Sequence, residues 1–196
     1  MSFGYRRMKR TGISIFFVES AKRVEASAKS TTAVGGHGSA HTGSHRRRRG
    51  MDITWVTERI GVGGGIWTSE NMARVAGAGI THIVDMQIEF DDTPLAGDHG
   101  IKVLWNPTDD DFEPKPAELL RRGVEFVEAA LSEQDAKVFI HCAAGVHRAP
   151  MMTLAVLGSM GWELEDAMRL IEARRPVADF VEVYVESVER FLAGAG

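Results

Sequence analysis

The segment HCAAGVHR, from His141 to Arg148, limits the possible folds of this chain more than any other feature. The run KVFIHC (residues 137–142) is short, apolar and β-branched, which predicts a buried strand that ends at the cysteine. An apolar helix is expected at residues 149–160. The five residues between Cys142 and Arg148 therefore form a strand-to-helix loop, in which Gly145 can adopt a positive φ.

A loop of this composition is suited to binding an anion. Small residues let the backbone curl so that its N–H groups point inward, and beside a helix N-terminus such groups form an anion site. The guanidinium of Arg148 can hold two oxygens of a tetrahedral oxyanion. The same field favours the thiolate of Cys142, which predicts a nucleophile that forms a cysteinyl-phosphate. The alternative is a buried structural cysteine beside a helix-capping arginine. The residues expected to bind phosphate are Ala143, Ala144, Gly145, Val146, His147 and Arg148.

The remainder of the chain alternates strands with helices. Residues 53–64, which end in glycines, are expected to form a strand pair or a strand and a turn, and buried strands are expected at residues 81–87 and 101–107. Helices are expected at residues 69–79, 116–131, 164–174 and 177–192. This order predicts an α/β fold with a central, mostly parallel sheet of four to five strands flanked by helices. The run GVGGG (residues 61–65) lacks the helix that a dinucleotide-binding loop requires directly after it, so we interpret it as a glycine turn.

Charge divides the chain into two parts. Of the 23 basic and 27 acidic residues, the first fifty positions hold 11 and 2, which leaves 12 and 25 for residues 51–196. Residues 26–50 are rich in Gly, Ser, Thr and His without apolar periodicity, which predicts a disordered basic extension. Its four arginines (residues 46–49) are a solvated charge run, a nucleic-acid patch or a localisation signal; a transit peptide and a mis-assigned start before Met51 are further alternatives.

Composition also limits which compartment and which partners are expected. One cysteine excludes an internal disulfide and fits a reducing compartment, so a cytoplasmic protein is expected. The acidic part disfavours nucleic acid and anionic membranes as partners, and no apolar run has the length of a membrane span. No cofactor and no metal site are predicted. Nothing in the sequence indicates an oligomeric state.

The segment HCAAGVHR resembles the His-Cys-five-residues-Arg signature of the cysteine-dependent protein phosphatases, in particular the small dual-specificity class. Residues 60–86 are similar to the N-terminal pattern of that class, and ARRPVADF (residues 173–180) to its late Arg-Arg-Pro stretch. The resemblance covers about residues 53–192. It implies a phosphatase domain over residues 51–196, with Cys142 as nucleophile and Arg148 as phosphate ligand. It also implies that His141 supports the loop from beneath; a satisfied core histidine is the equal alternative for this residue. His147 lies in the loop, where it is expected to face the substrate entrance.

The leaving group needs a proton, which a carboxylic acid on a movable loop can donate. WNPTDDDFEPKP (residues 105–116) offers Asp109, Asp110, Asp111 and Glu113. The acid of the family lies about thirty residues before its cysteine. Asp110, 32 residues before Cys142, fits this spacing best, and Asp111 is next.

One position departs from the family. Most members have Ser or Thr after the arginine, where the hydroxyl assists departure of the sulfur, and this chain has Ala149. Plant glucan phosphatases carry a similar Arg-Ala-Pro. The leading prediction is hydrolysis of phosphotyrosine, phosphoserine or phosphothreonine in proteins. The alternatives are a phosphatase of small-molecule or carbohydrate phosphates and a phosphate-binding pseudophosphatase. A sulfurtransferase also uses a cysteine in a curled loop but has no need of an acid-bearing loop.

Overall fold

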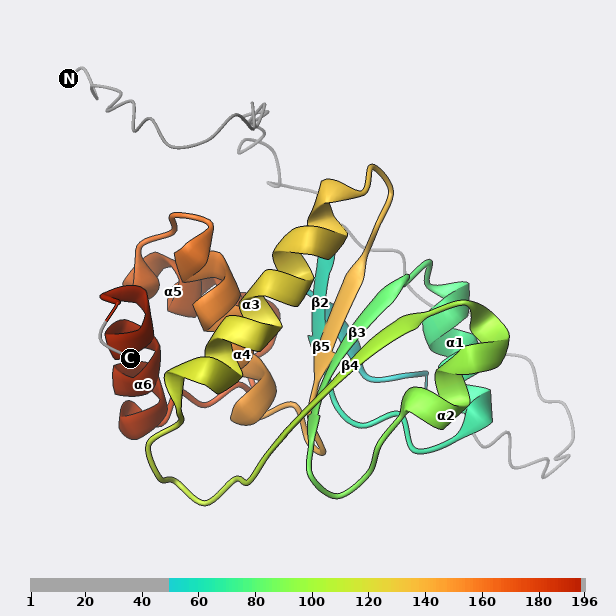
Figure 1. The fold of residues 1–196 in the computed structure, drawn as a ribbon, viewed down its shortest axis with the longest axis horizontal. Coiled ribbons are helices and arrows are strands. Elements are labelled where there is room, and N and C mark those ends of the chain that lie inside the picture. Colours follow the sequence, from blue (N-terminus) through green and yellow to red (C-terminus); the bar gives the residue numbers. More distant parts are fainter. Residues whose placement is uncertain (1–49, 195–196) are drawn as a thin grey trace, which may run out of the picture. The chain divides into compact units, whose positions relative to one another are not determined.

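The computed structural model describes residues 50–194, so the predictions for residues 1–49 lie outside the described part. A five-stranded sheet in the order β1-β2-β5-β3-β4 forms its centre (Figure 1). The first pair of strands is antiparallel and the other neighbours are parallel, which confirms the predicted sheet. The strands are β1 (Ile53–Trp55), β2 (Ile60–Gly63), β3 (His82–Gln87), β4 (Lys102–Thr108) and β5 (Val138–His141).

Helices cover both faces of this sheet. Figure 1 shows α3 to α6 on one side of the strands and α1 and α2 on the other, the layered arrangement of an α/β domain. The helices are α1 (Ser69–Gly77), α2 (Thr93–Ala96), α3 (Ala117–Ser132), α4 (Arg148–Ser159), α5 (Leu164–Arg174) and α6 (Glu182–Leu192), with a short 3-10 helix η1 (Gly97–His99).

The middle strand β5 separates two hydrophobic cores. Val138 and Ile140 belong to the larger core, under α3 to α6, and Phe139 belongs to the smaller one, under α1 and α2. This division follows from the alternation of side chains along a strand. All residues of β5 are buried, and a strand is hydrogen-bonded on each side of it. The point where β5 ends is therefore fixed within the fold.

Helix α4 is fixed equally well by packing. Ten consecutive residues, from Arg148 to Leu157, are buried. A helix that is apolar on nearly all sides packs within a core rather than over its surface. The N-terminus of α4 and the C-terminus of β5 are thus two rigid points, and the short loop between them is held at both ends.

Several boundaries differ from the sequence prediction. Helix α6 begins at Glu182, not at residue 177, because Pro176 follows α5 and the N–H of Asp179 bonds the carbonyl of Val146. Strand β4 is not the buried strand that was expected: it lies at the sheet edge, and of its residues only Asn106 is fully buried.

Smaller differences concern turns and caps. Thr68 caps α1 and accepts a hydrogen bond from the N–H of Asn71. Gly61 and Gly63 lie within β2 instead of a turn. Helix α2 and η1 were not predicted, because elements of four and three residues carry no periodic signal.

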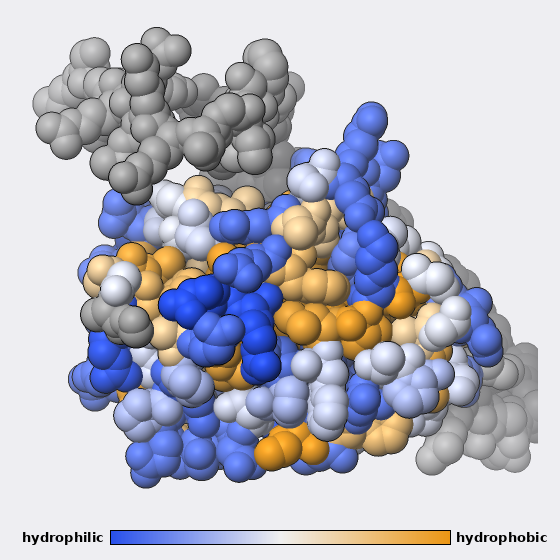
Figure 2. Space-filling model, viewed as in Figure 1, coloured by the Kyte–Doolittle hydropathy of each residue, from blue (hydrophilic) through white to orange (hydrophobic). Residues whose placement is uncertain are grey.

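The face in Figure 2 is largely hydrophilic, with hydrophobic residues gathered near the middle of the view, in the region of β4. Within residues 50–194, no helix has the length and apolar content needed to cross a bilayer.

Candidate active site

The loop that follows β5 curls around the sulfur of Cys142. Gly145 has a φ of 65°, and its N–H donates a hydrogen bond to Cys142 Sγ at 3.2 Å. A Cβ atom at position 145 would lie 2.5 Å from the backbone of Gly63 and 2.4 Å from the guanidinium of Arg175. Only glycine satisfies both the backbone angle and this contact. The sulfur is nearly inaccessible, with 1% of Cys142 exposed.

The carbonyl groups of this loop all bond to partners outside it. The carbonyls of Ala143, Ala144, Gly145 and Val146 accept hydrogen bonds from Gly65 N, Arg175 Nη2, Arg175 Nε and Asp179 N, respectively. Four successive peptide planes are thereby fixed with their oxygens outward. This orientation leaves the N–H side of the loop for an anion.

Arg175 holds two of these carbonyls and is itself held by Asp52. It is 3% exposed and donates from Nε to the carbonyl of Gly145 at 2.7 Å. Its two terminal nitrogens bond the two oxygens of Asp52 at 2.9 and 2.7 Å. Hydrogen bonding to Arg175 holds the pKa of Asp52 below its ordinary value, although burial opposes this. The Arg-Arg-Pro stretch thus contributes a buttress for the loop.

Arg148 is the first residue of α4, and its guanidinium is paired with Glu89. The terminal nitrogens bond both carboxylate oxygens of Glu89 at 2.9 and 2.8 Å, and one also bonds the carbonyl of Thr108. Burial acts to lower the pKa of Arg148, but hydrogen bonding to Glu89 and the charge of Cys142 outweigh it, and the pKa is raised. Arg148 Nε is buried and has no hydrogen-bond partner among the described residues.

Glu89 was not identified from the sequence. It follows β3, and Cys142 follows β5, so parallel pairing of these strands brings both residues to the same edge of the sheet. The hydrogen bond from Arg148 lowers the pKa of Glu89. An acidic residue two positions after a buried strand was the available signal, and it is a weak one.

Of the three adjacent aspartates, Asp110 faces the loop. Its Oδ2 lies 3.1 Å from His147 Nδ1 and 3.7 Å from Arg148 Nε. Asp111 is bound to Lys115 and to the N–H of Glu113, and Asp109 is exposed.

Tyr184 of α6 positions this segment. Its hydroxyl donates to Asp110 Oδ1 at 3.2 Å and accepts from the N–H of Phe112 at 3.2 Å. The Tyr184 ring stacks on that of Phe112. Lys115 Nζ also lies over the Tyr184 ring, 5.1 Å from its centroid. Burial raises the pKa of Tyr184 to about 12, so the hydroxyl keeps its proton near neutral pH. Sequence reasoning missed this residue.

His141 lies beneath the loop in a fully buried cluster with Asp85 and Asp92. Its Nε2 is 3.2 Å from Asp92 Oδ2 and 3.7 Å from Asp85 Oδ1. Burial raises the pKa of Asp85 to about 6, partly offset by His141. These three residues have the donor types of a cation site. Asp85, however, already accepts hydrogen bonds from the backbone N–H groups of Gln87 and Asp92, and both carboxyl groups face the same imidazole nitrogen, Nε2.

Ala149 is fully buried directly after Arg148 and offers the sulfur no hydroxyl. Thr153 is the nearest hydroxyl-bearing residue along α4, and its Oγ1 donates to the carbonyl of Ala149 at 2.8 Å. The hydrogen-bond donor found on Cys142 Sγ is the N–H of Gly145.

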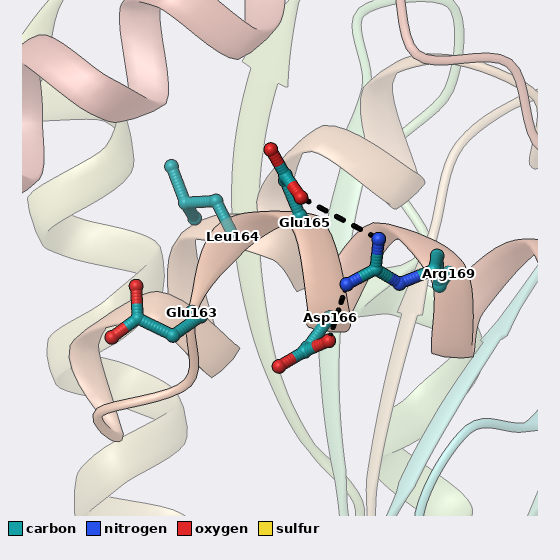
Figure 3. Close-up of a pocket in the computed structure, with 5 residues that line it drawn as sticks. All are labelled: Glu163, Leu164, Glu165, Asp166 and Arg169. Carbon is teal, nitrogen blue, oxygen red and sulfur yellow. Dashed lines mark hydrogen bonds and ion pairs between the residues drawn. The ribbon is translucent and has the colours of Figure 1, made fainter.

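A separate surface hollow lies at the start of α5 (Figure 3). Its one cation, Arg169, is paired with Glu165 and Asp166, as the dashed lines show. The hollow contains none of the residues described above, and its lining carries three carboxylates and one guanidinium. It is lined by Glu163, Leu164, Glu165, Asp166 and Arg169.

Comparison with known proteins agrees with this geometry. The family model of the dual specificity phosphatase catalytic domain matches residues 66–187, which include Asp110, Cys142 and Arg148. Human protein tyrosine phosphatase type IVA 3 is 34% identical over 99 residues, which are 50% of this chain and 56% of the human protein. The mouse protein is 32% identical over the same length. This chain thus spans about half the length of the curated relatives that it matches.

Solved structures show the same fold. The crystal structure of PTPMT1 has a TM-score of 0.65 and 18% identity, covering 73% of this chain and 95% of that one. Human DUSP28 has a TM-score of 0.61 and 21% identity, covering 72% and 93%.

Proposed function

Because this chain belongs to the family of dual specificity phosphatase catalytic domains, we propose that it hydrolyses phosphomonoesters through a cysteinyl-phosphate on Cys142. The observation that carries the proposal is the outward fixing of the four loop carbonyls around the sulfur. It leaves the N–H groups of the loop, with Arg148 at the start of α4, to hold the three non-bridging oxygens of a phosphoryl group.

In the first step, the thiolate of Cys142 attacks phosphorus and the ester oxygen leaves. The buried, unpartnered Nε of Arg148 supplies a hydrogen bond to a phosphate oxygen while Glu89 keeps the guanidinium in place. Asp110 protonates the leaving oxygen, which costs less than expelling an alkoxide.

In the second step, water attacks the cysteinyl-phosphate, Asp110 takes its proton, and the thiolate of Cys142 departs. The departing sulfur carries negative charge and needs a hydrogen-bond donor. Ala149 supplies none, and the N–H of Gly145 at 3.2 Å supports the thiolate instead.

We propose phosphorylated protein as the substrate class. No lysine lies in the loop of residues 143–147, which disfavours highly anionic substrates such as inositol phospholipids. Exposed Phe112, beside His147, offers an apolar surface to an amino-acid side chain. One structure of PTPMT1 is a complex with PI(5)P, and that ligand belongs among the competitors to be tested. A reducing compartment such as the cytoplasm suits this chemistry, because the nucleophile must remain a thiol.

The test is a phosphate-release assay on phosphotyrosine, phosphoserine and phosphothreonine peptides, phosphosugars and phosphoinositides, with Cys142→Ser as the control. Turnover that is highest on the peptides and absent in Cys142→Ser supports the proposal. Preference for phosphosugars would assign the enzyme to carbohydrate phosphates, which the Arg148-Ala149-Pro150 run favours. Tight binding of phosphopeptides without turnover would indicate a pseudophosphatase.

A further inference from the structure

The imidazole of His147 bridges two carboxyl groups at the mouth of the site. Nδ1 lies 3.1 Å from Asp110 Oδ2, and Nε2 lies 3.4 Å from Asp179 Oδ2. The side chain is 20% exposed, and the ring of Phe112 packs edge-on against it with centroids 5.3 Å apart. The mechanism above uses the backbone of His147 in the phosphate loop and leaves this side chain without a role.

The other partners of Asp110 determine which oxygen carries its proton. The Tyr184 hydroxyl donates to Oδ1, so Oδ1 acts as an acceptor. Because burial raises the pKa of Tyr184 to about 12, this donor persists at neutral pH. A proton bound by Asp110 therefore lies on Oδ2, the oxygen that is 3.1 Å from His147 Nδ1 and, at a longer distance of 3.7 Å, near Arg148 Nε.

The second carboxylate determines which imidazole nitrogen is protonated. A negative charge 3.4 Å from Nε2 favours a proton on that nitrogen. In neutral imidazole, Nδ1 then carries a lone pair and accepts a hydrogen bond from Asp110 Oδ2–H. The two contacts on His147 thus have matching donor and acceptor roles.

We propose that Asp110 and His147 share one proton, and that this pair, rather than Asp110 alone, exchanges it with substrate and water. The inference rests on the phosphatase activity proposed above. When the P–O bond breaks, the shared proton passes to the ester oxygen, and Asp110 remains as carboxylate beside neutral His147. When water attacks phosphorus, its hydroxyl oxygen bonds to phosphorus, the S–P bond breaks, and its proton restores the pair.

The kinetic test compares phenyl phosphate with 4-nitrophenyl phosphate, which have nearly the same shape but differ in how much the leaving oxygen needs a proton. In His147→Asn, the side chain can still hydrogen-bond near the Nδ1 position but cannot carry a proton. The ratio of kcat/KM for phenyl to 4-nitrophenyl phosphate should fall about tenfold. Asp179→Asn should lower the same ratio by a smaller factor. A ratio for His147→Asn equal to that of the parent protein would overturn the inference.

A double-mutant comparison separates proton sharing from a structural role. With Asp110→Asn already present, His147→Asn should lower the phenyl phosphate rate no further, because no shared proton remains to be lost. Full additivity of the two changes would mean that His147 acts on its own. Melting curves of each variant identify any loss of folded protein.

A spectroscopic readout does not depend on activity. The ¹⁵N chemical shift of His147 Nδ1 should move between the parent protein and Asp110→Asn, because the shared proton is lost. An unchanged shift would refute proton sharing even if the enzyme is active. Absence of turnover of both phosphates, with the expected shift change, would instead refute the phosphatase proposal and retain the proton-sharing pair.

Discussion

The hydroxyl of Tyr184 bonds the side chain of Asp110 and the backbone of Phe112, both at 3.2 Å, and so ties the acid-bearing loop to α6. Tyr184 is 2% exposed and lies 74 residues from Asp110 in the sequence. An acid on a loop must be held within about an ångström of its working position to donate a proton efficiently. We therefore propose that Tyr184 positions Asp110, the proposed acid.

Tyr184→Phe should slow the enzyme by about fivefold on phenyl phosphate, the factor that corresponds to one hydrogen bond of ~1 kcal/mol. The ring and its packing on Phe112 are retained. The effect should be smaller on 4-nitrophenyl phosphate, whose leaving group needs the proton less. Steady-state kinetics on both substrates check this, and equal losses on both would place the role of Tyr184 in folding alone.

The three adjacent aspartates provide an internal comparison for the acid. Asp110→Asn should reduce kcat on phenyl phosphate by about 10²-fold or more. Asp111→Asn, which removes a charge bound to Lys115, should cost much less, and exposed Asp109→Asn should be nearly neutral. Kinetics of the three variants decide between them, and a dominant loss in Asp111→Asn would transfer the acid role to that residue.

The buttress from Arg175 should control phosphate affinity as well as stability. Arg175→Met removes the hydrogen bonds to the carbonyls of Ala144 and Gly145 and the pairing with half-exposed Asp52, and a loss of about 1–3 kcal/mol is expected for leaving buried carbonyls unsatisfied. Arg175→Lys cannot reproduce the paired contacts and should bind vanadate, a phosphate-like oxyanion, about tenfold more weakly. Exposed Arg174→Met is the matched control and should change neither property. If Arg175→Lys binds vanadate as tightly as Arg174→Met does, the inference that Arg175 holds the loop for anion binding would be wrong.

Because Ala149 has no hydroxyl to assist the departing sulfur, hydrolysis of the cysteinyl-phosphate is expected to be slow. Cysteinyl-phosphate should accumulate and give a burst of leaving group followed by slower turnover. Ala149→Ser would add a hydrogen-bond donor worth on the order of 1.5–3 kcal/mol to a charged sulfur, which corresponds to a gain of roughly one to two orders of magnitude in that step. Rapid-quench kinetics measure both phases. A parent protein without a burst, unimproved by the serine, would show that the first step limits the rate.

Burial of Asp85 predicts a pH dependence of stability. A carboxyl whose pKa is raised from 3.8 to about 6 favours the folded state fully below pH 3.8 and loses that contribution as pH rises through 6. The loss amounts to ~3 kcal/mol at 1.36 kcal/mol per pH unit. Asp85→Asn removes this titration, so the difference in unfolding free energy between the parent protein and the variant should change between pH 4 and 7. A constant difference, measured by urea titration, would count against the raised pKa.

Local patterns were enough to predict the strand-loop-helix unit. Residues 137–142 predict a buried strand, Gly145 a turn with positive φ and residues 149–160 a helix, and the structure contains all three features, with β5 at Val138–His141 and α4 at Arg148–Ser159. The prediction worked because every part of the unit is contiguous in sequence.

The groups that hold this unit in place could not be predicted in the same way. Arg175 meets Asp52 across 123 positions, and Arg148 meets Glu89 across 59. Such pairs depend on how the elements pack, and one sequence carries no signal for which of many charged residues will meet. The predicted start of α6 was wrong for a related reason. The hydrogen bond from the N–H of Asp179 to the carbonyl of Val146 keeps an apolar segment out of the helix.

The central place of β5 in the sheet also affects how this domain comes apart. Edge strands open first in local fluctuations, and β5 is shielded by two neighbours and by a core on each face. Its amide hydrogens should exchange with solvent among the slowest in the domain, while those of β1 and β4 exchange earlier. The proposed nucleophile is thus attached to the segment that is released last, whereas the proposed acid Asp110 follows the edge strand β4. Activity should therefore be lost when β4 opens, before global unfolding, while the loop after β5 still binds a phosphate-like anion.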